Sequence, residues 1–206
     1  PGAPLQLPLI EVLAKLKPLL QNPQSKKCAQ NGKYDMHVLN RYAIAVQGLR
    51  EDTMLASFVL NAGRARHDMD SMAENYLGYK TIAYSDVTGK GAKQISFSQV
   101  AIDDAAGYAA EDADITLQLK NIFLPKLKEK EVEKVFYEVD NPLVKVLTAM
   151  EFEGIKVDEG FLNNYSKELE KEARAAEEAV YKQAGVRFNL ASPKQLGEVL
   201  FDKMQI

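Results

Sequence analysis

The sequence is poor in the residues that build disulfide frameworks and metal clusters. It has one cysteine, Cys28, two histidines and no tryptophan among 206 residues. A single cysteine excludes an internal disulfide and a cysteine-cluster zinc site, and it favours a reducing compartment. Neither His37 nor His67 has a second histidine or a cysteine at ligand spacing, so a histidine-based zinc site is not expected.

Long apolar runs and a strong charge of one sign are also missing. No run approaches the ~20 residues of a membrane-spanning helix, and we expect no membrane partner. The net charge is −3, from 26 basic and 29 acidic residues. This balance excludes bulk electrostatic binding of nucleic acid, so any phosphate contact must be local. Hydrophobic residues make up 46% of the chain, which is typical of a globular protein with a real core.

Both ends and the charge distribution indicate part of a longer, divided chain. The first residues lack an initiator Met and a signal-peptide pattern, and the last residues stop inside an amphipathic pattern. Residues 1–128 hold 15 basic and 13 acidic residues, whereas residues 129–206 hold 11 and 16. We therefore expect two domains, 1–128 and 129–206, in a chain truncated at both ends.

Helical periodicity dominates the sequence and predicts a helix-dominated α/β fold. Either Asp68 or Asp70 is expected to cap a short helix, and Pro125 is expected to kink or end a long one. Residues 79–98 are expected to be loop, including a basic tip at 89–93 that is either a solvated turn or a phosphate-binding loop. Short strands are expected at 27–30 and 155–157. Helices are expected near 9–20, 36–43, 53–60, 71–77, 102–127, 142–153, 158–183 and from 193 onward.

The helix around Tyr108–Asp114 carries the most informative carboxylate. Positions 108, 112, 115 and 119 share one face, and Asp112 is the acid in a stripe otherwise suited to burial. A buried carboxylate needs a proton, an ion pair or a metal cation, and Tyr108 stands one turn away to share its task. A salt bridge or a cap remains the simpler role for Asp112. Glu111 and Asp114 point elsewhere and are expected to be solvated.

A second candidate is Asp35, which follows the strand and turn of 27–32 and falls in the first turn of a helix. Its simpler role is to interact with the helix dipole. Each acid alone is a weak signal.

Together these residues resemble a known pattern. Asn31–Asp35 and, some seventy residues later, Tyr108–Asp112 resemble the second and third motifs of the DEDDy 3'-5' proofreading exonucleases. Four further stretches resemble bacterial family A DNA polymerases of the polymerase I type, and the resemblance covers essentially the whole chain. These stretches are 51–55, 66–71, 151–157 and 188–196.

The resemblance implies a partial RNase H-like exonuclease domain over 1–128, followed by the mostly helical start of a polymerase domain that leads into its thumb. The first exonuclease motif, an Asp-x-Glu pair, would lie before Pro1, and the polymerase palm and fingers would lie after Ile206. The whole protein would then be an enzyme of DNA replication and repair in the bacterial cytoplasm, associated with the nucleoid. The 206 residues alone would be inactive.

The resemblance also assigns roles to single residues. Proofreading of this kind is two-metal phosphodiester hydrolysis, with Mg²⁺ or else Mn²⁺ or Zn²⁺ held by carboxylates. Asp112 would bind the ion that activates water, and Asp35 would hold the second ion through bound water. Tyr108 would orient the water, because a phenol of pKa ~10 is a poor base at neutral pH. The two-ion site would be incomplete in this chain.

The implied partners are a frayed single-stranded 3' end, a primer-template and, for the whole polymerase, deoxynucleotides. Amides and Arg reach phosphates or bases, and aromatic faces stack on unpaired bases. Tyr34 and Tyr84 are alternatively core aromatics, and Arg66 alternatively pairs with Asp68 or Asp70. The residues expected to contact the strand are Gln30, Asn31, Tyr34, Arg66 and Tyr84.

Two other functions remain open. The chain could be a non-catalytic single-strand binding or structural module with a degenerate exonuclease site, or a helical adaptor. The acidic balance and the retained ligand positions argue against the first. The second would leave the spacing of Asp35, Tyr108 and Asp112 as coincidence.

Overall fold

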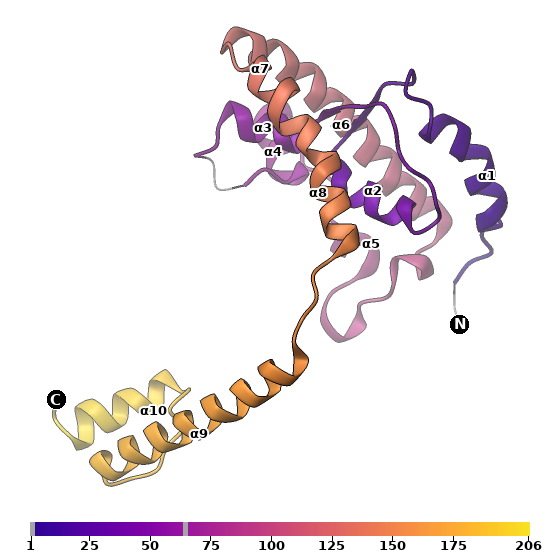
Figure 1. The fold of residues 1–206 in the computed structure, drawn as a ribbon. Helices are drawn as coiled ribbons and strands as arrows, with labels where there is room; N and C mark the ends of the chain where they lie inside the picture. The colour runs from indigo at the N-terminus through magenta and orange to yellow at the C-terminus, as the bar shows by residue number, and fades with distance from the viewer. Residues whose placement is uncertain (1–2, 64–65) are drawn as a thin grey trace. The chain divides into compact units, whose positions relative to one another are not determined.

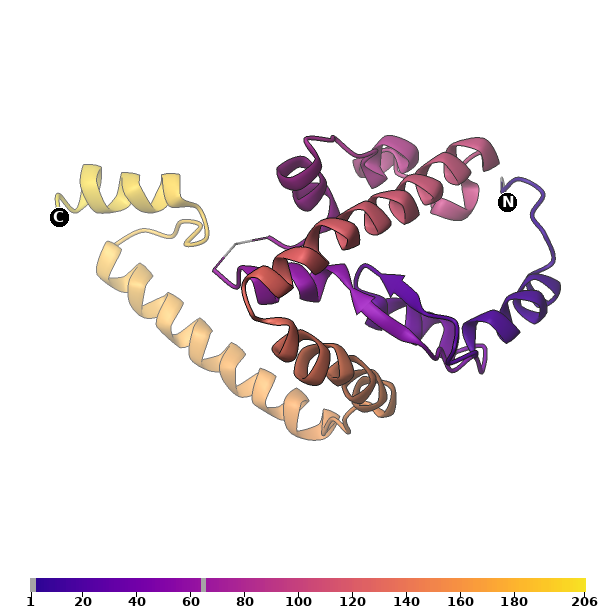
Figure 2. The same ribbon diagram turned by 90° about the horizontal axis from the view of Figure 1, so that it is seen from above.

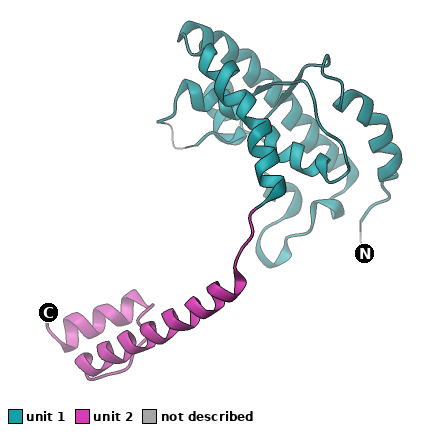
Figure 3. Ribbon diagram, viewed as in Figure 1, with its two compact units in different colours: residues 1–154 teal, residues 155–206 magenta. Residues whose placement is uncertain are grey.

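The computed structural model describes residues 3–63 and 66–206, which divide into two compact units (Figure 3). Unit 1 runs to Gly154, and unit 2 begins at Ile155. This division differs from the expected boundary at 128/129, which separates the two domains that the family resemblance implies. That boundary stays a prediction. Each unit is described by itself.

Unit 1 combines a small parallel sheet with many helices (Figures 1 and 2). The described residues of the whole chain are mostly helical, so the prediction of a helix-dominated α/β fold is confirmed. None of their helices is long and apolar enough to cross a membrane. The elements of unit 1 are α1 (Leu9–Leu20), β1 (Lys27–Ala29), α2 (Gly32–Asn40), β2 (Leu49–Asp52), α3 (Thr53–Leu60), α4 (Met69–Leu77), α5 (Tyr84–Thr88), the short turns η1 (Gly91–Lys93) and η2 (Phe97–Gln99), α6 (Ile102–Glu129), α7 (Glu133–Val135), the wide turn η3 (Phe136–Asp140) and α8 (Asn141–Glu153).

Strands β1 and β2 pair in parallel and are connected through α2. Cys28 pairs with Glu51 and Ala29 with Asp52, so both strands end at the same edge of the sheet. Side chains that follow parallel strands lie near one another at that edge. In sheets of this kind, ligands bind at the carboxyl ends of the strands.

Strand β2 is missing from the sequence-based expectation. Its residues, Leu49–Asp52, include three charged side chains and lack the alternation that marks a strand. Pairing with β1 makes it a strand, and such pairing overrides local propensity. Gly48 before it has φ +72°, and a Cβ there would come within 2.4 Å of the Ser25 carbonyl oxygen, so the turn into β2 requires glycine.

Helix α6 packs on α3, α4 and β1 and contributes four of the nine buried residues of the larger core. Pro125, expected to kink or end this helix, does not end it, because α6 continues to Glu129. Proline removes one N–H and crowds the preceding turn, and so close to the helix end few hydrogen bonds are at stake. The buried members of this cluster are Ala56, Leu60, Met72, Ala73, Ile115, Leu119, Phe123, Leu127 and Phe136.

Helix α4 begins as its capping signals indicate, and the choice between two candidate caps is settled. Asp68 is the N-cap and accepts a hydrogen bond from the Ser71 N–H at 3.0 Å. Gly78 ends the helix with φ +64°, the left-handed conformation that favours glycine. The following region, expected to be loop, contains α5, η1 and η2. The basic tip at 89–93 includes η1, with Lys90 and Lys93 exposed.

Unit 2 consists of α9 (Glu159–Ala184), α10 (Pro193–Gly197) and the wide turn η4 (Glu198–Lys203). Asp158 caps α9 by accepting the Phe161 N–H at 2.8 Å, and Ser192 and Pro193 open α10 as their sequence signals predict. The expected strand at 155–157 is wrong. These residues have no partner strand within the described part of the chain, and an isolated strand cannot satisfy its backbone polar groups.

Candidate active site

A cleft of about 420 Å³ opens beside the carboxyl end of β1 and brings the two candidate acids together. Asp35 enters it from α2, Asp112 from α6 and Gln30 from the end of β1. The rest of the lining is Cys28, Ala29, Met69, Ala113 and Thr116. The tertiary structure therefore places in one cleft two carboxylates that stand 77 positions apart in the sequence.

The turn that leads from β1 into α2 explains how Asp35 reaches this cleft. Asn31 adopts the left-handed conformation, with φ +60° and ψ +48°, which asparagine tolerates better than most residues. A Cβ on Gly32 would lie 2.9 Å from the Ala29 Cβ and 3.1 Å from Leu49 Cδ2. Glycine at 32 thus lets α2 start tightly against the sheet, which leaves Asp35 one turn into the helix.

Asp52, at the end of β2, fixes this turn from below. Its side chain is 1% exposed and accepts hydrogen bonds from four backbone N–H groups. Two come from the start of α2, Asn31 at 3.2 Å and Gly32 at 2.7 Å, and two from the start of α3, Met54 at 2.9 Å and Leu55 at 3.3 Å. One carboxylate therefore caps two helices.

Asp35 lines the cleft and is exposed to solvent. Partial desolvation by the cleft wall raises the pKa of its carboxyl, and the negative charge of Asp52 raises it further. Both effects disfavour the charged form of Asp35 and would be relieved by a cation in the cleft.

Asp112 and Tyr108 form the second part of the site. Asp112 is half-buried, and desolvation raises the pKa of its carboxyl; a hydrogen bond from Tyr108 opposes this rise, while Asp70 and Glu111 add to it. Burial, followed by the charge of Asp112, raises the pKa of the Tyr108 phenol above its ordinary value of 10.0. Tyr108 is therefore a neutral hydrogen-bond donor at physiological pH.

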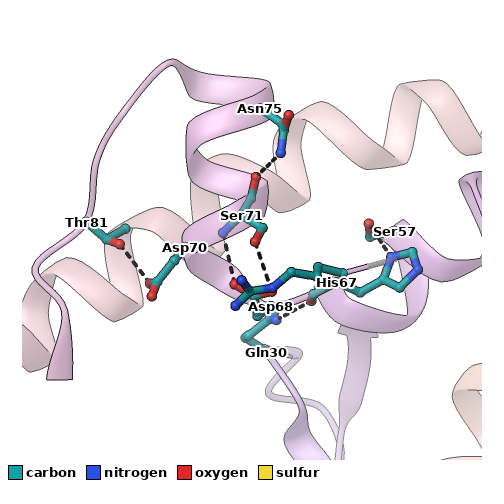
Figure 4. A network of polar contacts seen from close by, with 9 residues as sticks. Gln30, Ser57, His67, Asp68, Asp70, Ser71, Asn75 and Thr81 are labelled. Carbon is teal, nitrogen blue, oxygen red and sulfur yellow. Dashed lines mark hydrogen bonds and ion pairs between the residues drawn. The ribbon is translucent and has the colours of Figure 1, made fainter. Parts of the chain in front are cut away.

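Asp70 is a third carboxylate near this site, and its residue pattern indicated only a helix cap or a partner of Arg66. It lies in the first turn of α4 and accepts the Thr81 hydroxyl at 2.7 Å (Figure 4). Its charge adds to the raised pKa of both Tyr108 and Asp112, so Asp70 stands within electrostatic range of the two residues. Asp70 stands two residues after the cap, Asp68, and this position in the first turn of α4 was the only indication of it in the sequence.

Glu111 differs from its expected role as a solvated acid. It is half-buried and accepts hydrogen bonds from the Tyr79 hydroxyl and the Ile82 N–H, both at 2.7 Å. Glu111 therefore ties the segment after α4 to α6. Asp114 is exposed, as expected, and accepts a hydrogen bond from Gln118 on its own helix.

Gln30 is held by protein groups at the cleft wall. Its amide nitrogen donates to the His67 carbonyl at 3.1 Å (Figure 4), and its amide oxygen accepts from the Thr53 hydroxyl. The Nδ1 atom of His67 in turn lies 2.9 Å from the Ser57 hydroxyl. Gln30 thereby joins the end of β1 to the segment that precedes α4.

The two tyrosines expected to contact DNA are not core residues. Tyr34 is 67% exposed and Tyr84 46% exposed, which removes the alternative that they fill the core. Tyr84 stacks on Phe97, with ring centroids 6.0 Å apart, and both rings meet Tyr108 edge-on. Arg66 is exposed and pairs with Asp68, from Nε to Oδ2 at 2.8 Å, as one alternative holds.

The chemistry of this cleft is that of hard oxygen ligands. Asp35, Asp112 and the neighbouring Asp70 supply carboxylate oxygens, the donors preferred by Mg²⁺ and Mn²⁺. Across residues 3–63 and 66–206, however, His, Cys, Asp and Glu nowhere form a group of three or more arranged to hold a metal ion. The carboxylates present suit a divalent cation in kind, but they do not enclose one.

Comparison with known proteins decides the family. The model of the 3'-5' exonuclease domain of family A DNA polymerases matches residues 3–128. The chain belongs to this exonuclease family. The model of family A DNA polymerase itself matches residues 159–206. Asp35, Tyr108 and Asp112 all fall within the exonuclease match.

Individual relatives of this exonuclease chain agree. DNA polymerase I of Pseudomonas aeruginosa is 47% identical over 98% of the chain, and that of Rhizobium leguminosarum is 45% identical over 97%. The chain spans 23% and 20% of the lengths of these two proteins. Among solved structures, the POL domain of Pol1 from M. smegmatis in complex with DNA primer-template and dNTP superposes with a TM-score of 0.71 at 26% identity, covering 94% of this chain and 30% of that one.

Proposed function

We propose that this chain is the editing part of a bacterial DNA-directed DNA polymerase that removes nucleotides from a 3' end by metal-dependent phosphodiester hydrolysis. The observation that carries the proposal is the cleft that both Asp35 and Asp112 line, within a chain of the exonuclease family. The proposed domains are the exonuclease, 1–128, and the start of the polymerase domain, 129–206. The polymerase works on chromosomal DNA in the bacterial cytoplasm.

Asp112 and Asp35 are the proposed metal-binding residues, with Mg²⁺ as the first choice and Mn²⁺ or Zn²⁺ as substitutes. When bound, divalent ions would lower the pKa of the attacking water and stabilise the leaving 3' oxygen. Desolvation raises the pKa of both carboxyls in the metal-free chain, and a cation beside them would lower it again by favouring their charged forms. The family's Asp-x-Glu pair would complete the ligand set. Because these 206 residues supply no such pair to the cleft, we expect them to hydrolyse little on their own.

Tyr108 is proposed to orient the attacking water. Its raised pKa keeps the phenol protonated at neutral pH, so the hydroxyl donates a hydrogen bond and does not act as the base. Its hydrogen bond to Asp112 and its edge contacts with Tyr84 and Phe97 fix the ring.

A single-stranded 3' end is the proposed substrate. The exposed faces of Tyr34 and Tyr84 suit stacking on unpaired bases, and the exposed Arg66 suits a phosphate once it exchanges its partner Asp68. Gln30 lines the cleft, and Asn31 follows it in the turn between β1 and α2, outside the cleft lining. The whole polymerase would also hold a primer-template and deoxynucleotides.

Replacing Asp112 with asparagine in a polymerase polypeptide that contains this chain tests the proposal. We expect single-turnover 3'-5' excision to fall on the order of 10²-fold or more, while nucleotide incorporation is kept. Asp114→Asn is the matched control, because Asp114 lies two residues from Asp112 on the same helix, is exposed and does not line the cleft. Unchanged excision in Asp112→Asn, with single-strand binding retained, would favour the non-catalytic binding module.

A further inference from the structure

Helix α8 lies outside both ranges that match known families, 3–128 and 159–206, yet it packs on the helix that carries Asp35. Val144 of α8 is buried in one cluster with Met36 of α2 and Val46. Further along α8, the Thr148 hydroxyl lies 4.0 Å from the Met36 sulfur. The apolar contact thus runs along α8 and α2.

Near the end of α8, the Glu151 carboxylate contacts two side chains of α2. Glu151 accepts the Lys33 ammonium on Oε1 at 2.5 Å, and its Oε2 lies 2.9 Å from His37 Nε2. Lys33 and His37 are one helical turn apart, and Asp35 stands midway between them in the sequence. The Glu151 carboxylate therefore spans the turn of α2 that presents Asp35.

The other end of α8 is anchored to the sheet side of the unit. The Asn141 amide donates to the Arg50 carbonyl of β2 at 3.0 Å, and the Lys145 ammonium donates to the Gln47 side chain at 3.2 Å. With its first residues fixed near β2, α8 provides a rigid base for Glu151. The backbone of α2 is then held at its start by Asp52 and at its middle by Glu151.

We propose that Glu151 is a positioning residue of the nuclease site, which acts through Lys33 and His37 to fix the turn of α2 that carries Asp35. The inference rests on the proposed function. It assigns to α8 a part in editing, although this helix follows the segment matched as exonuclease. Glu151 does not line the cleft and does not touch substrate.

The proposal predicts a larger effect on metal use than on folding. The side chains of Lys33, His37 and Glu151 are 34%, 24% and 45% exposed, and exposed ion pairs contribute little to stability. Groups that orient metal ligands matter more, since their loss costs about 10–100-fold in metal affinity or activity. We expect about a tenfold rise in the Mg²⁺ concentration that half-saturates excision when Glu151 is replaced by glutamine.

Glu153→Gln is the matched control for Glu151→Gln. Glu153 is exposed on the same helix, and no ion pair or hydrogen bond of its side chain is found within the described residues. Both variants make the same chemical change two positions apart. In the metal-free 206-residue chain, Glu151→Gln should speed amide hydrogen exchange in α2 about fivefold and leave α3 unchanged, whereas Glu153→Gln should change neither.

The second arm uses a polymerase polypeptide that contains this chain. Glu151→Gln and Lys33→Met should each raise the half-saturating Mg²⁺ concentration of excision, and the double variant should raise it no further, with nucleotide incorporation unchanged. A double variant whose effect is the product of the two single effects, or equal exchange rates in Glu151→Gln and Glu153→Gln, would overturn the proposal. Failure of the function itself shows separately, as unchanged excision in Asp112→Asn.

Discussion

Replacing Asp52 with alanine should destabilise unit 1 by about 3–5 kcal/mol. The loss of a helix N-cap alone costs about 1–2 kcal/mol, and Asp52 caps α3 through Met54 and Leu55. The Asn31 and Gly32 N–H groups would lose their acceptor as well, and a buried donor without a partner costs about 1–3 kcal/mol. Contributions of neighbouring hydrogen bonds are not additive, so the expected total lies below the largest sum.

Native-state hydrogen exchange of the amides in α2 and α3 is the suitable assay, because it reports on unit 1 without interference from unit 2. Asp68→Ala is the control. Asp68 also caps a helix, but its side chain is 38% exposed and it serves one backbone N–H, so its loss should cost about 1 kcal/mol. If Asp52→Ala lowers the free energy of opening no more than Asp68→Ala does, the double-capping role of Asp52 is wrong.

Two further predictions concern titrating groups. Desolvation raises the pKa of the Cys28 thiol to about 11, from 9.0, so its thiolate population near pH 8 is about 100-fold lower than that of an ordinary cysteine. Alkylation by iodoacetamide should be slower by about that factor in the folded chain than in urea, and equal rates would contradict this. For Asp68, burial alone would raise the carboxyl pKa, but hydrogen bonds from Ser71 and Arg66 hold it below 3.8. Its stabilising contribution is therefore present above the unfolded pKa and lost as pH falls through the folded one, so Asp68→Asn should flatten the acid limb of stability below about pH 4. An unchanged acid limb would count against it.

The longer helices of this chain could be predicted because their signals are local, whereas the short α5 falls in a region expected to be loop. The apolar spacing of α6, the cap at Asp68 and the Ser192–Pro193 start of α10 each act within one or two turns. Strand β2 could not be predicted, since its charged residues become a strand by pairing with β1. The error at 155–157 also concerns pairing. This tripeptide has the composition of a strand, but it has no partner strand within the described residues.

The site was predictable in part for a similar reason. The motif resemblance pointed to Asp35 and Asp112, and the structure places both in one cleft. Asp52 acts on the start of α2, 20 positions away, and Glu151 acts on the same helix from 114 to 118 positions away. No local pattern reveals such contacts, because they depend on how β2 and α8 pack.

Asp35 and Asp112 are proposed to belong to one hydrolytic site. The most direct measurement is the rate of single-turnover 3'-5' excision by a polymerase polypeptide containing this chain, with Asp35→Asn, Asp112→Asn and both changes together. Two ligands of one site act as a unit, so the double variant should be no slower than the slower single variant. A double variant slowed by the product of the two single effects, or single variants that excise normally, would contradict the account.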